Sequence, residues 1–327
     1  MKNSSYILPE ARRGMLKATL QEPGRPLRII EAHNGLSAKI GEAATVSQDG
    51  KSQLGFDGLW VSSLTCSAAH GLPDMEIYAL ERRIESIEEI LHATTKPIIV
   101  DGDTGGESIA FDYLCRRLES LGISAVVIED KKHPKRNSLS LESSHVLEDP
   151  FVFGRKIQRA KDTLNTDNFM IFARLESLIA GQGIEDAIKR ARIYLDSGAD
   201  GVMIHSKEKV PDQIFDFLRR YNQLYPDASQ RKPVICVPTT YNHISAEVLF
   251  SKGVRIVIHA NHLLRAAHYA MTKTCESILR ADHSSVVDNY CTSVKDIFKF
   301  VGYDDALAKD HEDEKILLSR GIKLASC

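Results

Sequence analysis

Eight short apolar segments recur along the chain, and they constrain its fold more than any other feature. They are nearly continuously apolar rather than alternating, which is typical of strands buried on both faces of a parallel sheet. The segments lie at 28–33, 58–63, 97–103, 125–130, 169–176, 201–206, 233–238 and 254–260. The intervals between them are long enough for a helix and its loops.

Helical patterns occupy many of those intervals. Residues 75–94 are apolar at helical spacing and carry opposite charges four residues apart. Residues 108–122 end in Gly, a common helix C-cap, and 183–200 carry Gly198 near their end, before the next strand. Further patterns at 212–225 and 244–253 complete the series. Eight such strand–helix units predict an α/β protein with a (β/α)8 TIM-barrel fold.

A doubly wound open sheet is the alternative architecture. It usually has fewer strands, and a Gly-rich turn follows its first strand. In this chain the first strand is followed by HNGLSAK at 33–39. The barrel is therefore favoured.

The length of 327 residues suits one large domain or two small ones, and eight strand–helix units favour one. We expect residues 1–26 to be an N-terminal extension, 27–302 the catalytic barrel and 303–327 a C-terminal helical tail. Residues 45–55 are polar and indicate an insertion after the first barrel helix. Within the charged C-terminal part, 294–302 has the pattern of an amphipathic helix, and a last helix is expected at 308–321.

The composition excludes several classes of protein. The chain has 42 Lys and Arg against 44 Asp and Glu, a net charge of −2, whereas a protein that coats nucleic acid is normally strongly basic. Its apolar runs are far shorter than the roughly 20 residues of a membrane span, and the N-terminus has no secretory signal pattern. Six cysteines without C-x-x-C pairs or zinc-like spacing indicate reduced thiols. We expect a cytoplasmic protein that binds neither membranes nor nucleic acid.

Carboxylates stand at the C-terminal ends of two neighbouring strands, where the active site of a barrel forms. Asp101 and Asp103 are two residues apart, so on an extended strand their side chains would share a face, and Glu129 ends the next strand. Oxygen ligands without His or Cys favour a hard cation such as Mg²⁺. The alternative is that Asp-Gly-Asp is an inert, solvated turn.

Cationic or polar side chains end the next two strands. Arg174 and His205 would face an anionic substrate, since Arg grips phosphate or carboxylate with two parallel hydrogen bonds. The alternatives are an ion pair between Arg174 and Glu176 and a core histidine with a satisfied partner.

The loop at 129–144 combines basic and acidic residues. It is either a solvated basic loop or a mobile lid that brings Lys135, Arg136 and Asn137 over an anionic substrate and excludes water.

This loop carries a resemblance to a known family. EDKKHPKRNSL at 129–139 resembles the EDK-x5-NS signature of the phosphoenolpyruvate mutase family, in the isocitrate lyase / PEP mutase superfamily. The resemblance continues through most of residues 28–300, in EAHNGLSAKI, GFDGLWVSSLTCSAAHGLPD, DGDTGG, ARLESLIAGQG, GADGVMIHSK, VPTTY and ANHLLRAA. It implies a Mg²⁺-dependent barrel that interconverts phosphoenolpyruvate and phosphonopyruvate, the reaction that forms the C–P bond at the start of phosphonate biosynthesis.

The resemblance also implies roles for individual residues. Asp101 would bind Mg²⁺, with Asp103 and Glu129 holding its waters, while Arg174 and His205 would hold the phosphoryl group. The role of Asp74 stays open between phosphoryl acceptor and electrostatic partner. The pyruvyl pocket would be lined by Trp60, Ser62, Ser63 and Leu64, and a gating loop would contain Lys135, Asn137, Ser138 and Leu139.

Sequence differences from related enzymes of the superfamily favour some activities over others. The lyases of the superfamily carry a catalytic Cys in this loop, and the loop of this chain has none, so C–C lyase activity is disfavoured. Phosphonopyruvate hydrolase is a closer alternative, but this chain keeps the loop Asn137, which favours the mutase. A barrel kept only for binding would have lost these residues. The family implies a homotetramer, a dimer of dimers that exchanges C-terminal helices.

Overall fold

The computed structural model describes residues 6–22, 24–48, 50, 52–78, 80–133, 135–138 and 145–322. The chain divides into two compact units, residues 1–265 and 266–327, and each is described by itself. No helix within the described ranges is long and apolar enough to cross a membrane.

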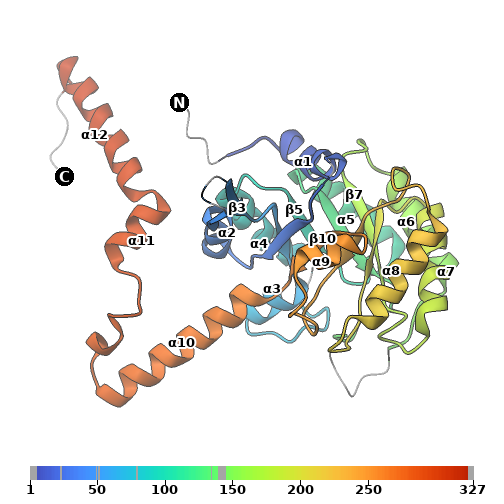
Figure 1. The fold of residues 1–327 in the computed structure, drawn as a ribbon. Coiled ribbons are helices and arrows are strands. Elements are labelled where there is room, and N and C mark those ends of the chain that lie inside the picture. Colours follow the sequence, from blue (N-terminus) through green and yellow to red (C-terminus); the bar gives the residue numbers. More distant parts are fainter. Residues whose placement is uncertain are drawn as a thin grey trace. The chain divides into compact units, whose positions relative to one another are not determined.

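The first unit is built around a closed barrel of eight parallel strands (Figure 1). Neighbouring strands pair in the order β1-β10-β9-β8-β7-β6-β5-β4, and β4 closes the barrel on β1. This confirms the predicted (β/α)8 fold. The strands are β1 (Leu27–Glu31), β4 (Gly58–Val61), β5 (Ile98–Asp101), β6 (Ala125–Glu129), β7 (Met170–Leu175), β8 (Gly201–Ile204), β9 (Val234–Cys236) and β10 (Val254–His259).

Helices follow the strands and surround the barrel (Figure 1). Four of them, α1, α3, α6 and α10, were missed by the sequence analysis, although Asp149 caps α6 by accepting from Phe151 N at 2.9 Å and Pro150 occupies its first turn. The helices of this unit are α1 (Pro9–Gln21), α2 (Gly35–Ala43), α3 (Ser63–Ala69), α4 (Leu80–Ala93), α5 (Ser108–Leu121), α6 (Pro150–Asp162), α7 (Gly183–Asp196), α8 (Asp212–Leu224) and α9 (Ala246–Ser251), and α10 (His262–Ala281) starts here.

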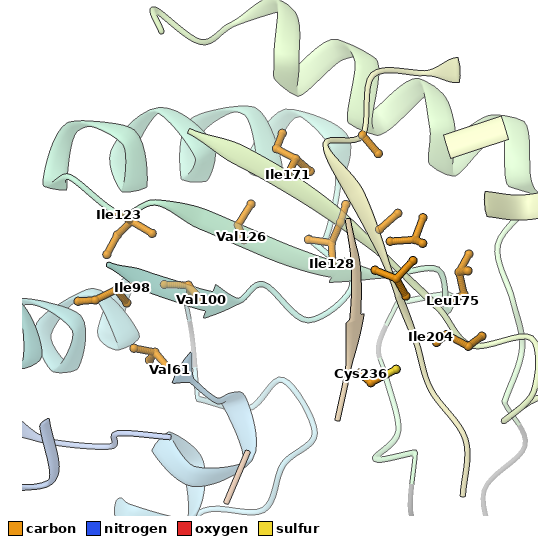
Figure 2. Packing of buried hydrophobic residues seen from close by; sticks show 14 of the residues in the cluster. Val61, Ile98, Val100, Ile123, Val126, Ile128, Ile171, Leu175, Ile204 and Cys236 are labelled. Carbon is orange, nitrogen blue, oxygen red and sulfur yellow. The ribbon is translucent and has the colours of Figure 1, made fainter. Parts of the chain in front are cut away.

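Two apolar layers explain why the strands are continuously apolar. Along β5, Ile99 belongs to the cluster inside the barrel, whereas Ile98 and Val100 belong to the cluster between the barrel and its helices. Figure 2 shows side chains of this outer layer, including Ile98, Val100 and Val126. Since both faces of each strand are buried, alternation of polar and apolar residues is absent.

Within the predicted N-terminal extension, α1 packs on the barrel. Leu16 of α1 is 1% exposed and belongs to the cluster inside the barrel. The Arg12 guanidinium donates to the carbonyl oxygens of Leu91 at 3.0 Å and Thr94 at 2.7 Å. Ser124, just before β6, donates to the Arg12 carbonyl at 2.8 Å. These contacts place α1 at the end of the barrel where the strands begin.

The polar insertion at 45–55 is an antiparallel pair of strands, β2 (Thr45–Gln48) and β3 (Ser52–Gly55), directly after α2. The sequence prediction of its position is confirmed. It forms its own two-stranded sheet and adds no strand to the barrel.

The second unit contains the end of α10, a short 3-10 helix (Ser284–Val287), α11 (Val294–Val301) and α12 (Tyr303–Ser319). Gly302, with φ of 84°, ends α11, and the Phe298 ring stacks on Tyr303 with 4.9 Å between centroids. The helices expected near 294–302 and 308–321 are therefore present. The last barrel strand ends at His259, and the unit that contains it ends at residue 265, before the predicted boundary at 302.

Gly201 tests the tight barrel packing. A Cβ there would lie 2.6 Å from the Phe172 ring and also against the Pro233 carbonyl, so we expect Gly201→Ala to lower the free energy of unfolding by about 1–3 kcal/mol. Gly14→Ala in α1 is the control, because its Cβ would meet Asn168 at an ordinary 3.5 Å and Ala favours helix. Urea unfolding followed by circular dichroism measures both. Equal stability of the two variants would contradict this packing.

Candidate active site

A cavity of about 70 Å³ lies at the C-terminal ends of the barrel strands. All of the predicted site residues line it except two. Asp103 lies outside the lining, and Leu139 lies outside the described residues. The lining consists of Trp60, Ser62, Ser63, Leu64, Asp74, Asp101, Glu129, Lys135, Arg136, Asn137, Ser138, Arg174, Met203, His205, Val237, Thr239, Ala260 and Asn261.

Asp101 is the last residue of β5 and is held by the start of α3. Its Oδ2 accepts from Ser63 Oγ at 2.9 Å and from Ser63 N at 3.3 Å, and its Oδ1 accepts from Asp103 N at 3.1 Å. The side chain is buried. Its carboxylate oxygens are therefore held in a fixed position in the lining of the cavity.

From the sequence, Asp101 and Asp103 were expected to share one face of an extended strand. This expectation is wrong. The strand ends at Asp101, and Asp103 has a φ of 54°, which turns the chain away from the extended conformation. Its carboxylate forms ion pairs with Arg83 and Lys135. Burial by itself would raise the pKa of Asp103, but these two cations outweigh it and hold the pKa well below the usual range.

A second cluster surrounds the buried carboxylate of Glu176. It accepts from Arg174 Nε at 2.5 Å and from Ser138 Oγ at 2.6 Å, and it lies 2.9 Å from His205 Nδ1. The ion pair between Arg174 and Glu176, which the sequence analysis offered as an alternative, is present, and Arg174 lines the cavity as well. Burial, together with the positive charge of Arg174, lowers the pKa of His205, which favours the neutral imidazole.

Glu129 lies between the two clusters. Its carboxylate oxygens are 3.4 Å from Arg174 Nη1 and 3.2 Å from Lys131 Nζ. Burial raises the pKa of Glu129 to about 7 despite these cations. A further cation near this carboxylate would favour its ionised form.

The loop after β6 turns its side chains into the cavity. Lys135 is 3% exposed, and its Nζ donates to Ser63 Oγ at 2.7 Å and lies 3.0 Å from Asp74 Oδ1. Asn137 Nδ2 donates to Asp74 Oδ2 at 2.7 Å. The reading of a solvated basic loop is therefore wrong for Lys135. The described part of this loop contributes Lys135, Arg136, Asn137 and Ser138 to the cavity lining, and we call residues 131–133 and 135–138 the lid.

Several site residues were missed or underrated by the sequence analysis. Val237 and Thr239 follow β9, and Ala260 and Asn261 follow β10. They also stand at the ends of strands, but none of them is charged, so nothing in the sequence singled them out. Glu176 was considered only as a partner of Arg174.

A family model described as phosphoenolpyruvate phosphomutase matches residues 16–279. The chain belongs to the phosphoenolpyruvate phosphomutase family. It is 38% identical over 283 residues to phosphoenolpyruvate phosphomutase of Tetrahymena pyriformis, which covers 86% of this chain and 89% of that protein. A crystal structure of phosphoenolpyruvate phosphomutase from Streptomyces platensis subsp. rosaceus matches with a TM-score of 0.83 and 35% identity, covering 91% of this chain and 98% of that one.

Another relative is named for a different reaction. Phosphonopyruvate hydrolase of Variovorax sp. (strain Pal2) is 34% identical over 289 residues, which covers 88% of this chain and 93% of that protein. The comparisons with phosphomutases and with the hydrolase are thus of similar strength. The family and the barrel are established by the matches, and the reaction has to be argued from the site.

The buried pair of Asp103 and Arg83 makes a stability prediction. Asp103→Ala leaves Arg83, 1% exposed, without its carboxylate, so we expect a loss of about 3–5 kcal/mol in the free energy of unfolding. The double variant Asp103→Ala/Arg83→Met should recover part of this loss, because it removes the unpaired charge. Urea unfolding of both variants measures the difference. A double variant less stable than Asp103→Ala would refute the pairing argument.

Proposed function

We propose that the protein is a phosphoenolpyruvate mutase that interconverts phosphoenolpyruvate and 3-phosphonopyruvate with Mg²⁺, as the first step of phosphonate biosynthesis. One observation carries the proposal: Asn137 on the lid donates to Asp74 inside a cavity that also contains Arg174 and His205. This arrangement would surround a phosphoryl group with polar side chains from several directions and keep water from it.

The reaction needs positioning more than covalent help. The phosphoryl group must leave the enolate oxygen and be captured by C3 of the same pyruvate through a loose, metaphosphate-like transition state. Arg174, His205 and Asn137 would hold the phosphoryl group while the pyruvate turns its other end toward it. Trp60, Ser62, Ser63 and Leu64 would line the pyruvyl side, and the first backbone N–H groups of α3 would bind the carboxylate.

The donor set fits Mg²⁺. Asp101 and Glu129 present oxygen atoms at the ends of neighbouring strands, and the ammonium of Lys135 already lies among Asp74, Asp103 and Ser63. Among the described residues no group of three His, Cys, Asp or Glu side chains is placed to hold a metal directly. We propose Asp101 as a direct ligand, with Asp103 and Glu129 acting through water. When bound, Mg²⁺ would supply stabilisation of the enolate charge.

Exclusion of water separates a mutase from a hydrolase. A metaphosphate-like species is captured by any water that reaches it, so closure of the lid over the cavity protects the transfer to carbon. Lys135, Asn137 and Ser138 all face inward from the lid. Hydrolysis of phosphonopyruvate to pyruvate and phosphate is the second candidate, supported by the 34% identity with the Variovorax enzyme.

Lyase activity has less support. The loop sequence at 129–144 contains no cysteine. The buried Cys66 of α3 has a pKa raised to about 12 by burial, so its thiolate is disfavoured. It does not line the cavity.

We also propose a homotetramer, a dimer of dimers that exchanges its C-terminal helices. No residue of α11 or α12 is buried in the single chain, and α11 exposes Val294, Ile297, Phe298 and Val301. Apolar side chains of this kind are commonly covered by a partner. Light scattering coupled to gel filtration measures the assembly, and a monomeric mass would overturn this proposal.

Phosphorus NMR tests the reaction. Enzyme, Mg²⁺ and phosphonopyruvate in one tube should give a phosphoenolpyruvate signal before inorganic phosphate accumulates. Phosphate as the primary product would select the hydrolase instead. Absence of both products would reject both activities.

Asn137→Ala tests the lid. We expect kcat to fall about 100-fold, as when one donor to a transition-state anion is removed, while thermal stability changes little because the residue is on a loop. Asn168→Ala, at an exposed surface position, is the control and should leave both unchanged. A large loss of stability with intact turnover would contradict the assignment of the lid.

Asp101→Ala tests the metal. The variant should lose activity and also lose measurable binding of Mg²⁺ in calorimetry, whereas chelation of the parental enzyme should abolish activity until Mg²⁺ is restored. Asp167→Ala, an exposed carboxylate remote from the cavity lining, is the matched control. Full activity of the parental enzyme after chelation would reject the Mg²⁺ requirement.

A further inference from the structure

Glu76 has an unusual backbone conformation beside the lid. It lies in the connection between α3 and α4 and has a φ of 58°, a region that residues with a side chain rarely adopt. Such conformations persist where surrounding contacts compensate for them, and they often mark functional positions. The contacts of Glu76 show what compensates here.

The Glu76 carboxylate ties two separate loops together. Its Oε1 accepts from Thr104 Oγ1 at 2.8 Å and from Thr104 N at 3.2 Å, in the loop that follows Asp103. Its Oε2 accepts from the backbone N–H of Lys135 at 2.8 Å and lies 2.8 Å from His133 Nδ1. The side chain is only 11% exposed, so these contacts are poorly screened by solvent.

The lid is thus held from two sides by one short segment. Asp74 lies in the cavity and takes the side chains of Lys135 and Asn137. Two residues later, Glu76 accepts a hydrogen bond from the backbone of the same lid, and it does not line the active-site cavity. It contacts the backbone N–H of Lys135, the residue whose ammonium enters the site.

We propose that Glu76 is a positioning residue that latches the lid shut and keeps water from the phosphoryl group. The proposal rests on the proposed function, because it assigns the latch to the lid of that site. Its strained backbone directs the carboxylate toward both Thr104 and Lys135. Without the latch the residues in the cavity are unchanged, but the lid opens more often.

An open lid would divert the phosphoryl group to water. In that side reaction the P–C bond of phosphonopyruvate breaks, and a water oxygen forms a bond to phosphorus. One proton of the water goes to C3 of the pyruvate enolate and the other is released with the phosphate. The products are pyruvate and inorganic phosphate, so the share of phosphate among the products reports lid closure.

Two substitutions distinguish the effect of the Glu76 carboxylate from the effect of its strained backbone. Glu76→Gln keeps the size of the side chain but removes its charge, and Glu76→Gly removes the side chain while fitting the positive φ. If Glu76 acted only through local backbone structure, Gly would behave like the parental enzyme. Glu88→Gln, an exposed carboxylate of α4 paired with Arg117, is the matched control.

The rate of cleavage by trypsin reports how often the lid opens, without any catalytic turnover. The described part of the lid contains four cleavage sites, Lys131, Lys132, Lys135 and Arg136. With Mg²⁺ and oxalate as the probe ligand, we expect cleavage in the lid to be about 10- to 100-fold faster in both Glu76 variants, the range for losing a charged hydrogen bond. Fluorescence of Trp60, the single Trp and part of the cavity lining, follows oxalate binding in the same samples.

The product ratio completes the test. With phosphonopyruvate, both variants should raise the share of inorganic phosphate about tenfold at unchanged melting temperature, whereas Glu88→Gln should match the parental enzyme. Unchanged lid cleavage, an unchanged phosphate share, or a parental phenotype of Glu76→Gly would each overturn the latch. If the parental enzyme makes no phosphoenolpyruvate, the proposed function fails, and the cleavage rates still decide whether Glu76 holds the lid.

Discussion

The site depends on buried pairs of opposite charge at one end of the barrel. In the pairs of Glu176 with Arg174 and of Asp103 with Arg83 and Lys135, no side chain is more than 14% exposed. Burying such charges costs much desolvation energy, and excellent geometry with additional hydrogen bonds has to offset it. The closed barrel supplies that geometry, because its strands end side by side and hold the charged residues at fixed spacing.

These pairs also connect the lid to the barrel. Lys135 reaches Ser63 at the start of α3 and Asp74 after it, while Ser138 contacts Glu176 after β7. The lid is therefore bound by polar contacts and not by an apolar core. Polar contacts that water can replace suit an element that has to open for substrate and close for reaction.

Local sequence patterns predicted the barrel and most of the cavity lining. The eight strands are continuously apolar because both faces are buried, and polar residues at their ends lie at the cavity because parallel strands all end at one side. The same reasoning failed at Asp103, since the strand ends before it and a positive φ turns the chain. It also missed α6, whose Asp-Pro start was readable.

The sequence by itself determined the architecture, the family and the residue types at the strand ends, because these follow from short-range periodicity and recognisable motifs. Only the tertiary structure decided which charges pair and what holds the lid. Glu76 and Lys135 are 59 residues apart, and Asp74 and Asn137 are 63 apart, so no local pattern relates them. Their contact exists because two loops that follow different strands meet at the same end of a closed barrel.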